Sequence, residues 1–112
     1  MVPLAAGLVV LVRFPFSDLS QTKLRPAVVL ANAGRGDWIL CQVTSKSYAD
    51  SAAVALEAAD FERGSLQVTS YARPGKLFTA SGDLVERVAG VLQPESVREV
   101  IAAVVTILRG SH

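Results

Sequence analysis

Cationic and hydroxyl side chains gather at two places where an apolar segment meets a polar one. Lys23-Leu24-Arg25-Pro26 places a guanidinium between a polar stretch and an apolar run. A guanidinium binds phosphate through paired N–H donors and stays charged at any working pH. Thr44-Ser45-Lys46-Ser47 combines three hydroxyls with one ammonium, a set that can orient a phosphate or a ribose hydroxyl. The plainer alternatives are an ion-paired arginine at a strand edge and an ordinary polar loop.

A third group places two cations beside an aromatic ring, in the segment Tyr71-Ala72-Arg73-Pro74-Gly75-Lys76. A nucleic-acid base could stack on Tyr71 or on Phe78, because every base has a π-face. Packing of each ring in the protein core is the plainer alternative.

Several kinds of chemistry are excluded by residue counts. Cys41 is the one cysteine, which excludes a disulfide framework and a cysteine-based metal cluster. His112 is the one histidine and ends the chain, which argues against histidine-pair catalysis and catalytic triads. Cys41 lies in a strongly apolar run and is predicted to be a core residue. Two carboxylate pairs are interpreted as solvated surface groups: Asp60 with Glu62, and Asp83 with Glu86.

Length and composition fit one globular domain over residues 1–112. Hydrophobic residues make up 51% of the chain and charged residues 19%, enough apolar side chains for a core. The formal net charge of +1 excludes a uniformly basic coat protein. Residues 1–49 carry +3 and residues 50–112 carry −2, so a phosphate ligand is expected nearer the first half, although uneven scatter of surface charge explains the count as well.

The apolar stretch over residues 1–12 has no preceding positive charge and no small-residue cleavage site after it. No run reaches the roughly 18–20 apolar residues that span a membrane. We therefore expect a soluble, cytoplasmic protein without a membrane partner.

Hydrophobic patterning predicts many short strands followed by one helix. The last segment begins at Pro94, a residue suited to the first position of a helix, and Gly110 offers a stop. Between them one apolar stripe is spaced as in a helix: Val97, Val100, Ile101, Val104 and Leu108. In the strand predicted over 38–44, alternation places Trp38, Leu40, Gln42 and Thr44 on one face.

The other elements follow from turn residues and apolar runs. Strands are expected over Gly7–Phe14, Pro26–Ala31, Val54–Leu56, Leu66–Thr69 and Val88–Leu92. Loops or turns are expected over 17–24, 32–37, 45–51 and 58–64. Two short extended pieces are expected around a turn at Pro74-Gly75. Residues 83–88 fit either a helical turn or a strand. Strands followed by a terminal helix favour a mainly β fold, a small barrel or curled antiparallel sheet with a C-terminal α-helix packed on it.

Four of these segments, in order, resemble the MazF/PemK-like toxins of bacterial type II toxin–antitoxin pairs. The matching segments are residues 7–18, the Arg25-Pro26-Ala27 strand, the strand 39–45 that ends in Thr-Ser, and residues 70–79. The resemblance implies an SH3-like barrel that forms a homodimer, a metal- and cofactor-independent endoribonuclease that cuts single-stranded RNA, and a cognate antitoxin protein that neutralises it.

The resemblance also assigns roles to residues. Arg25 matches the family's catalytic arginine and would hold the phosphate and take part in proton transfer. Thr44 matches the catalytic threonine and would orient the phosphate or the attacking 2′-OH. Further RNA contacts are expected from four side chains: Lys23, Ser45, Lys46 and Arg73.

The chain departs from the family pattern at three positions. Leu8 stands where an acidic residue is common, and Gly75 and Phe78 stand where members tend to carry Asp and Arg. Two alternatives therefore remain beside the ribonuclease. One is a CcdB-like toxin that binds DNA gyrase on the same fold, and the other is a degenerate member that only binds antitoxin or nucleic acid.

Overall fold

Every strand pairing among the described residues is antiparallel. The computed structural model describes residues 3–14, 23–47 and 50–110. The strands are β1 (Leu8–Phe14), β2 (Lys23–Gly34), β3 (Asp37–Thr44), β4 (Val54–Leu56), β5 (Phe61–Gly64), β6 (Ser70–Ser81) and β7 (Val85–Leu92). Two short 3-10 helices, η2 (Ala58–Asp60) and η3 (Gly82–Leu84), and one α-helix, α1 (Pro94–Leu108), complete the described elements.

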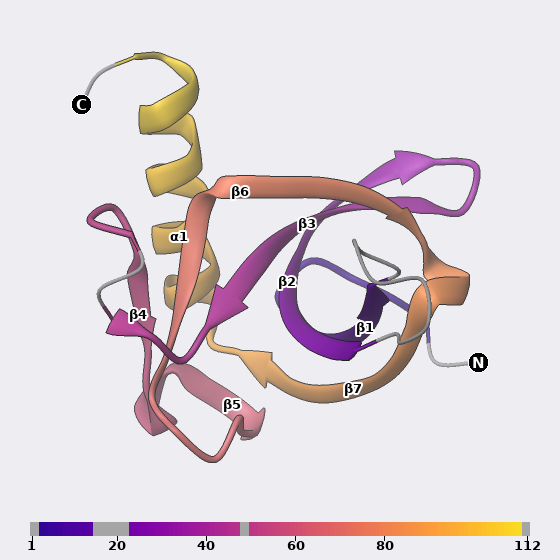
Figure 1. Cartoon of the computed structure of the whole chain (residues 1–112), viewed down its shortest axis with the longest axis horizontal. Coiled ribbons are helices and arrows are strands. Elements are labelled where there is room, and N and C mark those ends of the chain that lie inside the picture. Colours follow the sequence, from indigo (N-terminus) through magenta and orange to yellow (C-terminus); the bar gives the residue numbers. More distant parts are fainter. Residues whose placement is uncertain (1–2, 15–22, 48–49, 111–112) are drawn as a thin grey trace.

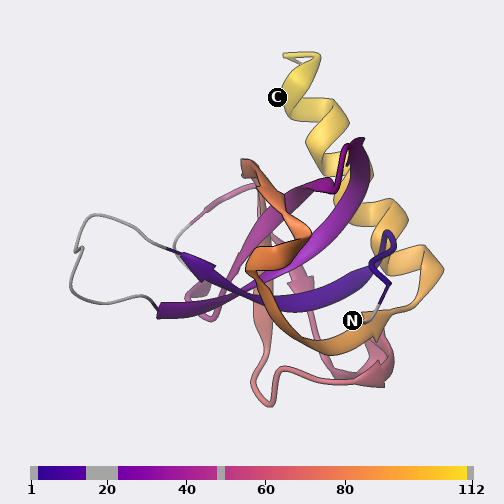
Figure 2. The same cartoon turned by 90° about the vertical axis from the view of Figure 1, so that its right-hand side faces the viewer.

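The strands form one sheet in the order β4-β6-β3-β2-β1-β7-β5. Figure 1 shows that this sheet curls on itself, because β6 passes through η3 into β7, which pairs with β1 on the other side of the curl. The helix α1 runs along the outside of the curled sheet, as the turned view confirms (Figure 2). The predicted mainly β barrel with a C-terminal helix is therefore confirmed.

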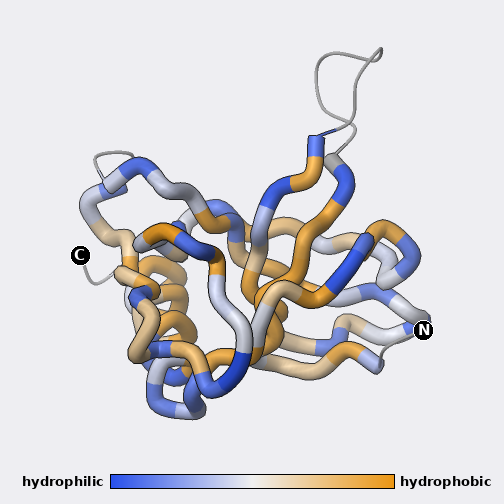
Figure 3. Tube along the Cα trace, turned by 90° about the horizontal axis from the view of Figure 1, so that it is seen from below, coloured by the Kyte–Doolittle hydropathy of each residue, from blue (hydrophilic) through white to orange (hydrophobic). Residues whose placement is uncertain are grey.

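The curl gives the sheet two buried faces. The inner face holds Val10, Val12 and Val29, whereas Val9 and Val28 belong to a second apolar cluster with Val100 of α1. Because β1 is covered on both faces, its sequence is a continuous apolar run and does not alternate. Figure 3 shows this pattern along the trace, with hydrophobic residues in the central strands and the helix.

The helix is placed as predicted, but its buried face is narrower than the apolar stripe. Val100 and Val104 are buried, while Ile101 is 37% exposed and Leu108 is 73% exposed. Pro94 lies in the first turn, and Gly110 follows the helix with φ +75, a conformation that favours glycine. The described helices include none that is both long and apolar enough to cross a membrane.

Asp60 is not the solvated group that the sequence suggested. Its Oδ2 accepts a hydrogen bond from the Glu57 backbone N–H at 2.8 Å, and its Oδ1 accepts one from the buried Ser96 hydroxyl at 2.8 Å. One half-buried carboxylate therefore closes η2 and ties it to the first turn of α1.

Five expected elements were wrong in type or extent. The segment 66–69 is not a strand, and 58–64 is η2 followed by β5 and not a turn. The two extended pieces expected around Pro74-Gly75 form one strand, β6, whose pairing with β3 shifts there. Lys23, Leu24 and residues 32–34 belong to β2, not to the flanking loops, and residues 83–88 divide between η3 and β7. The rest of the loops expected over 17–24 and 45–51 lies partly outside the described residues.

Candidate functional site

The ends of β2 and β3 bring the two principal candidates together. In the pairing of these strands Ala27 lies opposite Gln42, and continuing that register by two residues on each strand sets Arg25 opposite Thr44. Residues two apart share a face of a strand, so both side chains continue the face that carries Val29 and Leu40 into the barrel interior. They lie at one end of the barrel, where the apolar interior meets solvent.

A cavity of about 430 Å³ opens at this place and brings together all six residues predicted from the sequence. Its walls come from the start of β2, the end of β3 with the residues that follow it, the segment before β6, and β6 itself. The predicted residues in its lining are Lys23, Arg25, Thr44, Ser45, Lys46 and Arg73.

The cavity has a strongly positive lining. Four of its lining residues carry a positive charge, and its described lining contains no carboxylate. Lys23, Arg25 and Lys46 are exposed, so their charges can reach a ligand without being displaced from a buried pair. Cations collected on one concave surface raise the local concentration of an anion and orient it.

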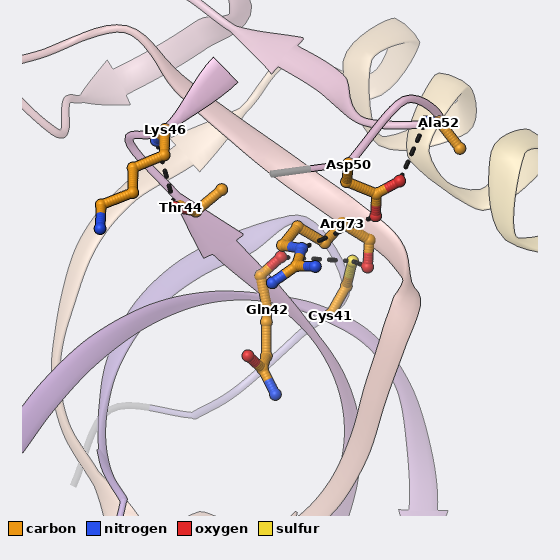
Figure 4. A network of polar contacts seen from close by, with 7 residues as sticks. All are labelled: Cys41, Gln42, Thr44, Lys46, Asp50, Ala52 and Arg73. Carbon is orange, nitrogen blue, oxygen red and sulfur yellow. Dashed lines mark hydrogen bonds and ion pairs between the residues drawn. The ribbon is translucent and has the colours of Figure 1, made fainter. Parts of the chain in front are cut away.

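Thr44 is held in place by the residue that follows the strand. Its Oγ1 accepts a hydrogen bond from the Lys46 backbone N–H at 3.1 Å, and Figure 4 shows the two side chains together on one side of the site. Because this oxygen accepts the backbone bond, the hydroxyl hydrogen remains available for donation to a ligand.

Arg73 enters the cavity from a bulge of β6. Cys41 and Val43 pair with Leu77 and Ala72, so one residue of β3 spans four of β6. The Cys41 thiol donates to the Arg73 carbonyl oxygen at 3.1 Å, which fixes the backbone of the bulge. Bulges of this kind re-aim side chains beside functional sites.

Asp50 holds the side chain of Arg73. The Arg73 Nε lies 3.7 Å from Asp50 Oδ2, and Asp50 Oδ1 accepts a hydrogen bond from the Ala52 backbone N–H at 2.9 Å. Figure 4 shows Asp50 and Arg73 turned toward each other, opposite Thr44 and Lys46. The Arg73 side chain as a whole is 24% exposed and lines the cavity, while its Nε is buried.

Cys41 is a core cysteine, as predicted. It is fully buried, and burial raises the pKa of its thiol to about 12. A neutral thiol in this position is not an activated nucleophile. Phe78 packs against the inner apolar cluster, and Tyr71 is half-buried and outside the cavity lining. Among the described residues no group of three or more His, Cys, Asp or Glu could hold a metal ion.

Sequence reasoning missed three features of the site. The cavity has an apolar wall made by Leu24, Leu66 and Val68. The sequence pattern places Leu24 in a loop and the other two in a strand. Gln42 also lines the cavity. A polar residue at an inward-facing position of an apolar strand could have indicated this role. No sequence pattern indicated that Asp50 would pair with Arg73, because the bulge in β6 brings the two residues together.

The match to a family covers nearly the whole chain. The family described as PemK-like, MazF-like toxins of type II toxin–antitoxin systems matches residues 5–108. Among curated proteins none matches the sequence significantly.

Solved structures share the fold at low sequence identity. An endoribonuclease in complex with its cognate antitoxin, from a mycobacterial species, has a TM-score of 0.74 at 17% identity, with 97% of this chain and 96% of that chain covered. MazF from Deinococcus radiodurans (Form-I) has a TM-score of 0.72 at 24% identity, with coverages of 97% and 98%. A MazE–MazF structure (Form-II) from the same organism has a TM-score of 0.72 at 23% identity, with 96% of each chain covered.

Proposed function

The chain belongs to the PemK-like, MazF-like toxins of type II toxin–antitoxin systems, and we propose that it is a single-domain endoribonuclease that cleaves single-stranded RNA without a metal ion. One observation carries this proposal: a single cavity gathers Arg25, Thr44 and three further cations at the open end of the barrel. A positive lining free of carboxylates in its described part suits a phosphodiester. The apolar wall beside the cations suits a nucleotide, whose base has an apolar face and whose phosphate is charged.

The reaction that needs only these groups is attack by the RNA's own 2′-OH. The 2′-oxygen bonds to the adjacent phosphorus and loses its proton, the bond from phosphorus to the 5′-oxygen breaks, and that oxygen gains a proton. The products are a 2′,3′-cyclic phosphate and a 5′-hydroxyl. The enzyme must align the attack and stabilise the added negative charge on the phosphoryl oxygens.

Arg25 and Thr44 are the proposed catalytic residues. Arg25 binds the phosphoryl oxygens with paired N–H donors and takes part in proton transfer, and Thr44 directs its hydroxyl hydrogen at the phosphate or the 2′-oxygen. The bond from the Lys46 N–H to Thr44 Oγ1 at 3.1 Å supports this orientation. Lys23, Ser45 and Lys46, together with Arg73, hold neighbouring phosphates and riboses.

The proposed partners follow from family membership. A cognate antitoxin neutralises the toxin, and solved relatives include an endoribonuclease with its antitoxin and a MazE–MazF pair. The active form is a homodimer that acts in the cytoplasm. The exposed apolar side chains Ile101 and Leu108 on α1 are compatible with contact to a second copy.

Purified protein incubated with a long, weakly structured RNA in the presence of EDTA tests the proposal. Discrete fragments ending in 2′,3′-cyclic phosphate are expected from the wild type. Arg25→Ala should lose this cleavage, while Arg63→Ala, which removes an exposed cation of β5 outside the cavity, should retain it. RNA left whole by folded wild-type protein would contradict the proposal and favour a toxin that binds a protein target.

A further inference from the structure

Gln42 is a polar residue in the otherwise apolar middle of β3. It lies on the same face as Thr44 and opposite Ala27 of the inner apolar cluster. Two residues along a strand on one face are roughly 7 Å apart, so the Gln42 amide lies one step deeper into the barrel end than the Thr44 hydroxyl. Both side chains line the same cavity.

The amide of Gln42 has unused hydrogen-bonding capacity. Gln42 is half-buried, and no hydrogen bond joins its side chain to another residue within 3–14, 23–47 or 50–110. Its backbone pairs with β2, and its backbone carbonyl also accepts a long bond from the Cys41 thiol at 3.7 Å. Figure 4 shows the side chain turned away from the Cys41–Arg73–Asp50 contacts. Solvent reaches this amide, because in the part of the chain that the structure describes Gln42 contributes no buried polar atom without a partner. A ligand in the cavity can therefore replace that water with its own paired donors and acceptors.

We infer that Gln42 reads the nucleobase next to the scissile phosphate, with adenine as the preferred base; this inference rests on the proposed ribonuclease function. With the phosphate held by Arg25 and Thr44, the attached ribose carries its base along the inner face of β3 toward Gln42. The cations beside it fix the phosphate and carry no sequence information, whereas a base edge is read by paired donors and acceptors.

The amide suits a base that presents an amino group beside a ring nitrogen, as adenine and cytosine do, and the larger adenine ring covers more of the apolar wall. A glutamine side chain presents one acceptor and one donor side by side, which matches the 6-amino group and adjacent ring nitrogen of adenine in a bidentate contact. Leu24, Leu66 and Val68 form the apolar wall of the same cavity and can cover the face of the base. Bases splayed out of single-stranded RNA are recognised in this way, by face contact and edge hydrogen bonds together.

Sequencing of all RNA ends produced by wild type and Gln42→Ala tests the inference. The wild type should show adenine at one fixed position beside the cut. Gln42→Ala should cut the same RNA with that adenine preference reduced by between about 5- and 150-fold, the range expected for one bidentate contact. Gln42→Glu, which exchanges the amide donor for an acceptor, should disfavour adenine in the same manner.

The matched control is Gln93→Ala. Gln93 is also half-buried, but it precedes α1, makes no side-chain capping bond and lies outside the cavity lining, so its variant should keep the wild-type profile. An unchanged end profile in folded Gln42→Ala and Gln42→Glu would overturn the inference while the ribonuclease stands. A wild type that cuts without adenine at a fixed adjacent position would also overturn it. RNA left whole by the wild type would instead remove the proposed function itself.

Discussion

The Nε of Arg73 lies 3.7 Å from Oδ2 of Asp50, so a cation of the cavity is tethered to the connection between β3 and β4. The backbone of the same arginine is fixed by the Cys41 thiol. Arg73 is thereby constrained at both its backbone and its side chain before any ligand arrives. A cation placed in advance stabilises developing charge without reorganisation at the moment of reaction.

Asp50 is therefore expected to act as a positioning residue. Asp50→Asn keeps an oxygen for the Ala52 N–H but removes the charge facing Arg73. The guanidinium becomes less fixed and the cavity more positive, so kcat should fall several-fold while KM for RNA falls or stays unchanged. Steady-state cleavage of a short RNA measures the effects on kcat and on KM separately. A kcat equal to that of the wild type would show that the ion pair has only a structural role.

The hydroxyl of Thr44 is expected to matter more than its methyl group. Thr44→Val keeps the shape of the side chain and loses both the acceptor for the Lys46 N–H and the donor toward the ligand. Its cleavage rate should fall by about 100-fold or more, the size seen when one donor to a developing oxyanion is removed.

Thr44→Ser is the matched control, since serine retains the hydroxyl and should stay within a few-fold of the wild-type rate. Single-turnover cleavage isolates the chemical step from product release. Equal rates for the valine and serine variants would contradict a catalytic role for the hydroxyl.

Local pattern predicted the strand 38–44, the terminal helix and the grouping of cations, because each depends on alternation, helical spacing or residue type alone. β5 was missed because it is an edge strand whose one buried side chain is Phe61, while Glu62 and Arg63 are exposed. Pro74 suggested a break in β6, yet it falls in the bulge opposite Gln42, where no ladder hydrogen bond is required.

The polar contacts of the site were less predictable than its members. Arg25 and Thr44 share a face of the sheet because of the register between β2 and β3. This register cannot be predicted from local sequence patterns. The pairing of Asp50 with Arg73, and the tie from Asp60 to Ser96, depend on how distant segments meet once the sheet has curled. The segment 66–69 was predicted as a strand from its apolar residues, but Gln67 adopts φ 71 and the segment lines the cavity.

Burial of Cys41 makes the stability of the fold sensitive to alkaline pH. The thiol pKa is raised from 9.0 to about 12 in the folded chain, so the folded state keeps a proton that the unfolded state releases above pH 9. Its contribution is fully present below pH 9 and is lost as the pH rises from 9 to about 12. One titrating group changes the free energy of unfolding by about 1.4 kcal/mol per pH unit in that window.

Cys41→Ala removes this titrating group, so the free energy of unfolding of the variant should fall less steeply than that of the wild type as the pH rises above 9. Urea unfolding at pH 8 and pH 10 measures the difference between the two proteins, expected to be about 1 kcal/mol. Parallel pH dependences would mean that the thiol ionises as readily in the folded state as in the unfolded one.

Asp60 is expected to contribute to stability although it lies outside the cavity lining. Asp60→Ala removes the acceptor for the buried Ser96 hydroxyl and for the Glu57 N–H, so the free energy of unfolding should fall by about 1–3 kcal/mol. Glu62→Ala, which truncates an exposed carboxylate of β5, should change it by less than about 0.5 kcal/mol. Thermal or urea unfolding compares the two, and equal small effects would show that the Asp60 contacts are exchanged for water without cost.

The exposed cations at the cavity should set the salt dependence of RNA binding. Measured on a Thr44→Val background, whose slow cleavage leaves time for a binding measurement, the logarithm of the binding constant should fall linearly with the logarithm of salt concentration, by about 0.7 for each phosphate neutralised on a single strand. Lys46→Ala removes one lining ammonium and should reduce the slope by about that amount while weakening binding to all sequences alike. Arg63→Ala, which lies outside the cavity lining, should leave the slope unchanged. If both variants lowered the slope equally, the RNA would be attracted by the overall charge of the protein and would not be held at this cavity.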